Sequence, residues 1–432
     1  MFIRHQLSVL FVVATSFSVT VQAAGFANQQ QSITHLGRAY AGAAAITEDA
    51  SGMFFNPAGM TQLQDSEISV GLNYIAPDIR FRNRNSRLPD GTAIRGGSGG
   101  NGSETPIAPN VYLAHRLNDK VVLGLGIGSP FGLATDYRTN WQGRYHALRS
   151  DLMTVNFNPA IAIKANDRLS LGFGINVQYI DLELSQAIDF GSSPLGSLPQ
   201  QQDGRVKINA NDWGVGFNLG MTYELTEITR LGLAYRSSIS HRLKGKGRFR
   251  LPDDLSGGLQ AAGFNNARVN GKVRLPETFS VAVHHQFAPD WAINADATWT
   301  RWSRYQTLAI DSANPRLSSE QAQNWKNSMR YGLGLTHQFN DAWTFRTGVA
   351  FDQTPVPDSA RRNPRTPDSD RTWLSVGASY QFNEQIVIDA GLAHIMGRQV
   401  NIRQRNANGY ILDGRYRTTI NIASLQLRWQ FD

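Results

Sequence analysis

The residues best suited to bind a charged ligand are arginines that interrupt alternating apolar stretches. Arg330, Arg346 and Arg371 fall on the face opposite the apolar residues of their stretches, and so does Asp352. A planar guanidinium can bind a carboxylate through two hydrogen bonds. We therefore predict these four positions as ligand-binding residues, with Arg330, Arg346 or Arg371 meeting a carboxylate. The alternative is that they form ion pairs that fill an interior.

The residue types needed for catalysis are not gathered by any motif. The chain has no Cys, which excludes disulfides, thiolate zinc sites and cysteine nucleophiles. His284 and His285 fall on opposite faces of one predicted strand, so they cannot share a metal ion. No P-loop and no His-x-x-x-His pair occurs. We expect no enzymatic activity, no cofactor and no metal.

The elements that must hold these side chains are β-strands. Apolar residues recur at every second position through most of the chain after residue 65, which is typical of strands with two unlike faces. Tight turns alternate with long polar loops, and aromatic residues such as Trp291 and Trp343 stand beside the tight turns. The even number of strands, the alternation of loop lengths and the aromatic residues together predict an all-β, fourteen-stranded antiparallel transmembrane barrel. The predicted strands are 66–83, 105–117, 119–129, 149–166, 168–185, 207–225, 227–245, 271–287, 290–307, 322–339, 341–354, 370–382, 385–400 and 415–431.

Composition agrees with this fold class. Only 18% of the 432 residues are charged and the mean hydropathy is −0.33, which excludes a bundle of membrane-spanning helices. Residues 1–23 combine a basic start, an apolar stretch and the sequence Val21-Gln22-Ala23, which predicts a cleaved signal peptide. We expect a multi-pass β-barrel, residues 66–432, in the outer membrane of a Gram-negative cell.

Residues 24–65 do not alternate and are punctuated by glycines and by Asn56-Pro57-Ala58. A barrel of fourteen strands is wide enough to leak if its lumen is empty. We therefore predict that this segment is a hatch folded inside the barrel.

Several motifs resemble the FadL-type outer-membrane transporters of long-chain fatty acids and hydrocarbons. The similarity runs in order along the mature chain. The motifs are Ala24-Gly25-Phe26, Leu36-Gly37-Arg38-Ala39-Tyr40-Ala41-Gly42, Glu48-Asp49-Ala50, Asn56-Pro57-Ala58, Pro276-Glu277-Thr278, Trp299-Thr300-Arg301-Trp302-Ser303, Phe351-Asp352-Gln353-Thr354-Pro355-Val356-Pro357 and Pro367-Asp368-Ser369-Asp370-Arg371-Thr372-Trp373. The resemblance implies a barrel with an internal hatch and passive, ligand-gated diffusion of hydrophobic molecules.

The resemblance also implies where a ligand travels. A capture groove is expected between loops 186–206 and 246–270, a tighter pocket at Phe26, and gating by the hatch. A lateral exit is expected where the predicted third strand is interrupted, since proline removes a ladder hydrogen bond and glycine permits a bend. The expected capture residues are Leu195, Leu198, Leu251, Leu255, Leu259 and Phe264; the hatch residues are Gly37, Arg38, Asn56, Pro57 and Ala58; the exit residues are Pro130, Phe131 and Gly132.

The substrate is left open between a long-chain fatty acid and a monoaromatic hydrocarbon or alkane, and the inward arginines favour the fatty acid. A general porin is a further alternative, against which the predicted hatch argues. Basic clusters at 242–250 and 80–87 favour contact with lipopolysaccharide or other outer-membrane lipids. We expect no nucleic-acid partner and a monomer.

Overall fold

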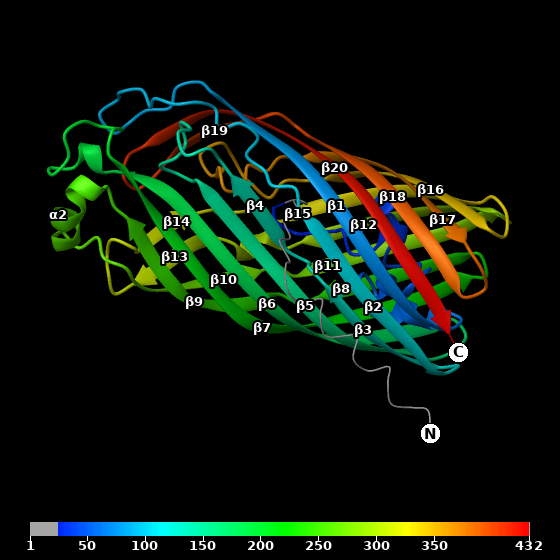
Figure 1. The fold of residues 1–432 in the computed structure, drawn as a ribbon. Coiled ribbons are helices and arrows are strands. Elements are labelled where there is room, and N and C mark those ends of the chain that lie inside the picture. The colour runs from blue at the N-terminus through cyan, green and yellow to red at the C-terminus, as the bar shows by residue number, and fades with distance from the viewer. Residues whose placement is uncertain (1–24, 432) are drawn as a thin grey trace.

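The computed structural model describes residues 25–431, so the predicted signal peptide lies outside the described residues. One sheet runs through the chain and closes because β1 pairs with β20 along its whole length (Figure 1). The strands are β1 Ser66–Asn83, β2 Ile107–Asn118, β3 Val121–Gly128, β4 Gly132–Asp136, β5 Arg149–Lys164, β6 Leu169–Asp189, β7 Asp203–Thr226, β8 Thr229–Arg236, β9 Ile239–Arg250, β10 Ala267–Leu275, β11 Thr278–Ala288, β12 Trp291–Thr300, β13 Thr307–Ser312, β14 Ser319–Ala322, β15 Ser328–Gln338, β16 Trp343–Asp352, β17 Arg371–Gln381, β18 Ile386–Gly397, β19 Val400–Arg405 and β20 Ile411–Phe431.

These strands make up a closed barrel of fourteen antiparallel strands, which confirms the predicted fold. We call each of the fourteen a stave, because some of them consist of two separate segments. Six staves are each interrupted once: β3 with β4, β8 with β9, β10 with β11, β12 with β13, β14 with β15, and β18 with β19. Short hairpins and the C-terminus lie at one end of the barrel, and the long loops with helix α2 (Ser256–Ala261) lie at the other (Figure 1). The described residues contain no helix long and apolar enough to cross a membrane.

Several strands are longer than predicted. β6 and β7 extend to Asp189 and from Asp203, and β9 and β10 extend to Arg250 and from Ala267. The predicted loops 186–206 and 246–270 are correspondingly shorter. The physical reason is that the barrel wall continues beyond the lipid, where a strand no longer needs an apolar outer face.

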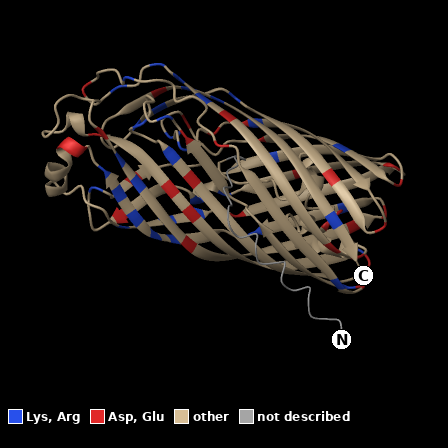
Figure 2. Cartoon of the chain, viewed as in Figure 1, with Lys and Arg blue, Asp and Glu red and all other residues tan. Residues whose placement is uncertain are grey.

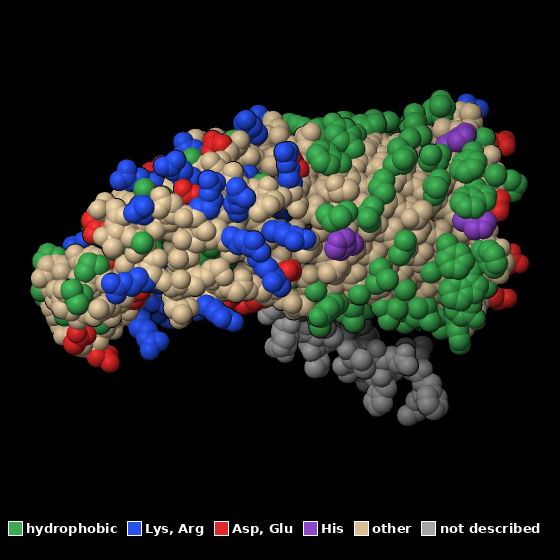
Figure 3. Space-filling model, turned by 90° about the horizontal axis from the view of Figure 1, so that it is seen from above, with side chains coloured by type: hydrophobic (Ala, Val, Ile, Leu, Met, Phe, Trp, Pro, Cys, Tyr) green, Lys and Arg blue, Asp and Glu red, His purple; other side chains and the backbone are tan. Residues whose placement is uncertain are grey.

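The two faces of the wall exchange polarity along a single strand. In β6 the side chains of Phe173, Ile175 and Tyr179 point outward, whereas Asn176 and Gln178 are buried inside. Past that point Asp181 and Glu183 point outward, while Ile180, Leu182 and Leu184 are buried inside. The same change is visible on the surface, where a hydrophobic band covers one half and Lys and Arg gather on the other (Figure 3). The half with the short hairpins therefore crosses the membrane, and the half with long loops stands outside it.

Residues 25–65, the described part of the predicted hatch 24–65, lie inside the barrel and contain α1 (Ile33–Leu36) and two 3-10 helices, η1 (Ala50–Phe54) and η2 (Pro57–Gln62). Helix α1 contacts β17, β18 and β20, and η2 contacts β5, β6 and β7. Inward-facing glycines allow this close approach: a Cβ atom at Gly220 would collide with Asn56, and one at Gly348 with the backbone of Arg38. The remaining short helices are η3 (Phe190–Ser192), η4 (Asp253–Leu255) and η5 (Trp302–Arg304).

Candidate functional site: the apolar interior, the hatch and the broken third stave

An apolar cluster fills the interior of the outer half of the barrel. Its side chains come from inward positions of strands, from the start of the hatch and from five segments that connect strands. The buried members are Phe26, Phe131, Leu133, Leu152, Ile180, Leu182, Leu184, Ile208, Ala210, Leu243, Val269, Val273, Leu275, Trp302, Ile310, Leu317, Trp325 and Val356. A barrel interior of this kind offers a hydrophobic molecule the surface that water does not.

Phe26 lies within this cluster and is buried. Its ring is 4.8 Å from that of Trp302, 5.5 Å from Tyr305 and 5.7 Å from Trp325, measured between centroids. The preceding amide, of Gly25, donates a 3.0 Å hydrogen bond to Asp368 Oδ2. The start of the hatch is therefore packed into the apolar cluster, and a tighter ligand pocket at Phe26 stays a prediction.

The third stave is broken between β3 and β4. Residues 129–131 leave the strand, and the hatch fills the gap with an antiparallel bridge between Ala27 and Phe131. The amide of Asn28 donates to Pro130 O over 2.8 Å, and its side chain donates to Ser129 O over 2.8 Å. The hatch thus supplies the backbone hydrogen bonds that the broken strand lacks.

A small cavity of about 80 Å³ adjoins this break, and residues of the hatch, Phe131 and Arg236 are among its lining. The guanidinium of Arg236 donates to Phe54 O over 2.6 Å and also to Asn176. It packs on the Phe54 ring with its central carbon 4.3 Å from the ring centroid. The lining therefore combines aromatic surface with one cation.

The four predicted charged residues all lie on the inward face and are buried. Arg330 donates to the Ala39 carbonyl of the hatch and lies 3.3 Å from Asp296. Arg346 lies 3.3 Å from Glu48 of the hatch and donates to Ser379 Oγ over 2.6 Å. They therefore hold the hatch to the wall, and their contact with a ligand stays a prediction.

The other two predicted charged residues, Arg371 and Asp352, stand at the ends of β17 and β16 that lead into the long loop between these strands. Arg371 forms an ion pair with Asp368. Asp352 is in register with Arg330 on one neighbouring strand and with Arg371 on the other. Because paired positions point to the same face, these three residues line one stretch of the interior. Their role toward a ligand also stays a prediction.

Arg365 is a buried cation that the sequence analysis did not single out. It lies in the loop between β16 and β17, and its guanidinium donates to Ser150 Oγ, His146 O and Gln186 Oε1, each over 2.9 Å. These partners are neutral, and burial lowers the pKa of Arg365 to about 10. Ser150 shares the inward face of β5 with Leu152 of the apolar cluster. Arg365 therefore stands at the outer edge of the apolar interior.

The predicted hatch residues fix this segment in place through hydrogen bonds, close packing and an ion pair. Asn56 caps η2 by accepting from the Ala58 amide over 3.0 Å, and its Nδ2 donates to Ala44 O over 2.5 Å and to Met221 O over 3.0 Å. Pro57 occupies the first turn of η2, where a missing amide hydrogen costs nothing. Gly37 packs closely on Gly377 of the wall. Arg38, fully buried, forms a 2.9 Å ion pair with Glu48.

The two predicted capture loops do come together. Gln202 of one loop donates to Asp254 of the other over 2.5 Å, and Leu195 borders Gly258 of α2. Leu195 and Leu198 are exposed, Leu251 and Leu255 are half-buried, and Leu259 is buried. Phe264 packs on Phe190 and Phe249, with ring centroids 4.9 Å and 5.5 Å away. Exposed leucines therefore stand on a packed base at the outer tip.

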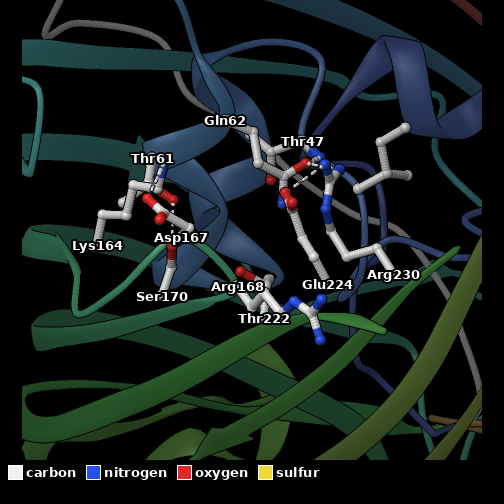
Figure 4. Close-up of a pocket in the computed structure, with 11 residues that line it drawn as sticks. Thr47, Thr61, Gln62, Lys164, Asp167, Arg168, Ser170, Thr222, Glu224 and Arg230 are labelled. Carbon is white, nitrogen blue, oxygen red and sulfur yellow. Dashed lines mark hydrogen bonds and ion pairs between the residues drawn. The ribbon is translucent and has the colours of Figure 1, made fainter. Parts of the chain in front are cut away.

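A larger cavity, about 300 Å³, lies at the other end, between the hatch and the wall (Figure 4). Its lining is polar: Thr47 and Gln62 of the hatch face Lys164, Glu224 and Arg230 of the strands and their turns. Arg230 donates to Gln62 over 2.7 Å and lies 3.0 Å from Glu224. This cavity does not suit a hydrophobic ligand. Within residues 25–431 no group of three potential metal-binding side chains occurs.

Comparisons with known proteins agree with this architecture. The family described as outer membrane protein transport protein (OMPP1/FadL/TodX) matches residues 14–431. The long-chain fatty acid transport protein of Escherichia coli O157:H7 is 33% identical, over 92% of this chain and 93% of that protein. The crystal structure of a Pseudomonas aeruginosa FadL homologue superposes with a TM-score of 0.87 at 27% identity, covering 95% of this chain and all of the other. The toluene transporter TbuX of Ralstonia pickettii shares the fold, with a TM-score of 0.66 at 20% identity, over 90% of this chain and 95% of its own.

Proposed function

This chain belongs to the OMPP1/FadL/TodX family of outer-membrane transport proteins, and from that premise we propose that it carries long-chain fatty acids across the outer membrane by passive, ligand-gated diffusion. The observation that carries this proposal is the apolar cluster inside the outer half of the barrel, into which the start of the hatch reaches. Burial of a fatty-acid chain there would remove apolar surface from water, at about 25 cal/mol per Å².

Capture is the first step of the proposed route. The exposed leucines Leu195 and Leu198, on the packed pair of loops, offer a fatty acid its first apolar contact. We propose that Leu251, Leu255, Leu259 and Phe264 complete the capture groove. A groove that stays open to water binds weakly, which suits a site that must pass its ligand on.

The second step is entry into the interior. We propose that the acyl chain displaces Phe26 from its aromatic contacts with Trp302, Tyr305 and Trp325. The carboxylate would then face cations at the edge of the cluster. Arg365 fits this role best, because its described partners are neutral oxygens, whereas Arg330, Arg346 and Arg371 have carboxylate partners.

The third step is lateral exit. If the hatch segment around Ala27 leaves the break at Ser129-Pro130-Phe131, the wall loses the hydrogen bonds that cover it. An opening there would lead from the apolar interior toward the bilayer without passing through water. We propose that residues 1–23 are removed as a signal peptide, that residues 24–65 gate the barrel, and that the barrel works as a monomer among outer-membrane lipids and lipopolysaccharide.

The aromatic cluster around Phe26 favours a second candidate substrate, a monoaromatic hydrocarbon, since flat rings pack well on aromatic edges and faces. Such a substrate needs no cation. An alkane would share the apolar interior and also needs no cation.

Uptake of radiolabelled oleate and of toluene by cells that lack their own transporter, with and without this chain, tests the proposal. A210F would fill the apolar interior, whereas A423F adds the same ring on the lipid face as a control. Oleate uptake that A210F lowers and A423F retains supports the fatty-acid route. Uptake of toluene without uptake of oleate would mean that the substrate is an aromatic hydrocarbon and not a fatty acid. Flux of polar solutes through the intact chain would indicate a general porin.

A further inference from the structure

A row of cations occupies the outer face of β9. Arg242, Lys244, Lys246, Arg248 and Arg250 stand at every second position and are all exposed. The residues between them point inward, where Leu243 and Phe249 join the apolar cluster. The row is therefore fixed in direction by the burial of the opposite face, since a shift by one residue would bury the cations.

Neighbouring strands add further cations directly opposite this row. Arg242 is paired in register with Lys272 and Lys246 with Arg268, both on β10. On the other side, β7 places Lys207 opposite Arg248 and Arg205 opposite Arg250. Like charges in directly opposite positions destabilise a sheet. We name these nine residues, Arg205, Lys207, Arg242, Lys244, Lys246, Arg248, Arg250, Arg268 and Lys272, the β9 cation patch.

Few anionic groups of the protein offset this charge. Among the described residues, Lys207 forms the one salt bridge of the patch, 2.7 Å from Glu183. Asp212 accepts the backbone amide of Arg242 over 2.7 Å and lies 3.7 Å from His241, so it is already engaged at the patch's edge. Asp311 lies opposite Asn270 on β10. The patch thus keeps a large excess of positive charge on a flat, exposed sheet.

The position of the patch relative to the membrane identifies what it can meet. Trp213, 57% exposed, ends the apolar outer face of β7, and two residues earlier Asn211 is already opposite Lys244. The row begins at the outer edge of the hydrophobic band and runs away from it, where Lys and Arg stand on the strands with some Asp and Glu among them (Figure 2). The row from Arg242 to Arg250 is about 27 Å long along the strand. At a strand tilt near 45°, its far end stands about 20 Å above the edge of the lipid.

We propose that the β9 cation patch is a binding site for the phosphorylated headgroup and inner core of lipopolysaccharide. This glycolipid carries its phosphates at the surface of the outer leaflet, at the height of the row. Lys and Arg bind phosphate through charge-assisted hydrogen bonds, and bound phosphates remove the repulsion between opposite cations. The inference rests on the proposed position of the barrel among lipopolysaccharide molecules, and it adds a specific place on the wall.

The test is binding of rough lipopolysaccharide to the full-length mature barrel in detergent. K244E/K246E reverses two charges in the patch, and K120E/R168E makes the same change in net charge at the turns of the opposite end, where both residues are exposed. We expect K244E/K246E to weaken binding about tenfold, with K120E/R168E unchanged. Dephosphorylated lipopolysaccharide should bind wild type as weakly as it binds K244E/K246E. Inorganic phosphate alone at the same phosphate concentration should not compete.

Misfolding is separable from lost binding. The carboxylate that K246E introduces would face Arg268, so heat-modifiable mobility and thermal midpoint without lipopolysaccharide should be equal to wild type or higher. Equal affinities for the two double variants, or undiminished binding of the dephosphorylated glycolipid, would overturn the inference. Oleate uptake by the same proteins keeps the two proposals apart. If the wild-type protein does not take up oleate, the transport function is refuted and the inference about the patch is not. If K244E/K246E loses glycolipid binding but takes up oleate normally, the patch binds the glycolipid independently of transport.

Discussion

The amide of Gly132 donates a 2.9 Å hydrogen bond to the carbonyl of Phe26, so the first residues of the hatch are joined to the resumption of the third stave. Together with the bond from Asn28 to Pro130, it brackets the pair Ala27 and Phe131 in the antiparallel arrangement that brings side chains closest. Any opening of the wall at this place requires the hatch to leave it.

A disulfide between A27C and F131C should lock the hatch in this position. The chain contains no other Cys, and the Cα separation of such a pair suits a disulfide. We expect cells with the oxidised A27C/F131C variant to lose oleate uptake, and reduction of the disulfide with dithiothreitol to restore it. The reduced double variant controls for the loss of the Phe131 ring. Equal uptake in the oxidised and reduced states would mean that transport does not need this movement.

The carboxylate partner can be tested by neutralising arginines one at a time. R365Q removes a cation whose described partners are neutral, so we expect weaker oleate binding, by about tenfold for one lost charge-assisted contact, with toluene uptake unchanged. R330Q, whose arginine faces Asp296 and the hatch, should instead affect both substrates through the hatch. Isothermal titration with oleate and with its methyl ester measures the difference; equal loss for acid and ester would assign Arg365 a structural role.

The staves and the inward charges were predictable because their signals are local. Alternation with period two and tight turns such as Asn340-Asp341 can be recognised from the sequence without knowledge of tertiary contacts. The same alternation correctly placed Arg330 and Arg346 inside the barrel. The sequence of β6 also contains the change from a polar to an apolar inner face, at Ile180, Leu182 and Leu184. Its meaning depends on where the membrane ends, which no local pattern states.

Other features of the site depend on contacts between distant segments. Arg365 comes from a loop that folds inward to reach Ser150 and Gln186, which are far from it in sequence. Trp325 likewise reaches Phe26, although the two residues are far apart along the chain. Neither Arg365 nor Trp325 belongs to a periodic pattern, so sequence periodicity carried no signal for either.

The Glu48 carboxylate should be essential for keeping the lumen closed. It lies 2.9 Å from Arg38 and 3.3 Å from Arg346, and so ties the hatch to β16. Removing one partner of a buried ion pair costs about 3–5 kcal/mol, because the remaining charge is left without compensation. We expect E48Q to loosen the hatch and to admit small polar solutes, measured as conductance in planar bilayers. K120Q, which removes an exposed cation at the turn between β2 and β3, is the control and should leave the conductance at the wild-type level.

His35 should make the docking of the hatch depend on pH. Its Nδ1 lies 2.9 Å from Ser32 Oγ and its Nε2 lies 3.0 Å from Ile46 O, which suits a neutral ring that accepts from the hydroxyl and donates to the carbonyl. Burial, assisted by the charge of Arg38, lowers the pKa of His35 to about 4. Released from the hatch's packing, the ring would have its ordinary pKa of about 6.5.

The sign of the effect follows from this lowered pKa. The undocked hatch binds a proton at His35 between pH 6.5 and 4, whereas the docked hatch does not, so docking is fully stable above pH 6.5 and weakens as the pH falls toward 4. Burial opposes the charge on Glu48, but Arg346 and Arg38 outweigh it and hold its pKa below the usual range, so this carboxylate stays ionised across the window. We expect polar-solute conductance to rise as the pH is lowered from 7 to 4.5 in wild type. H35Q, which removes this titration, should reduce the rise over the same window; a wild-type profile that matches that of H35Q would remove His35 as the cause.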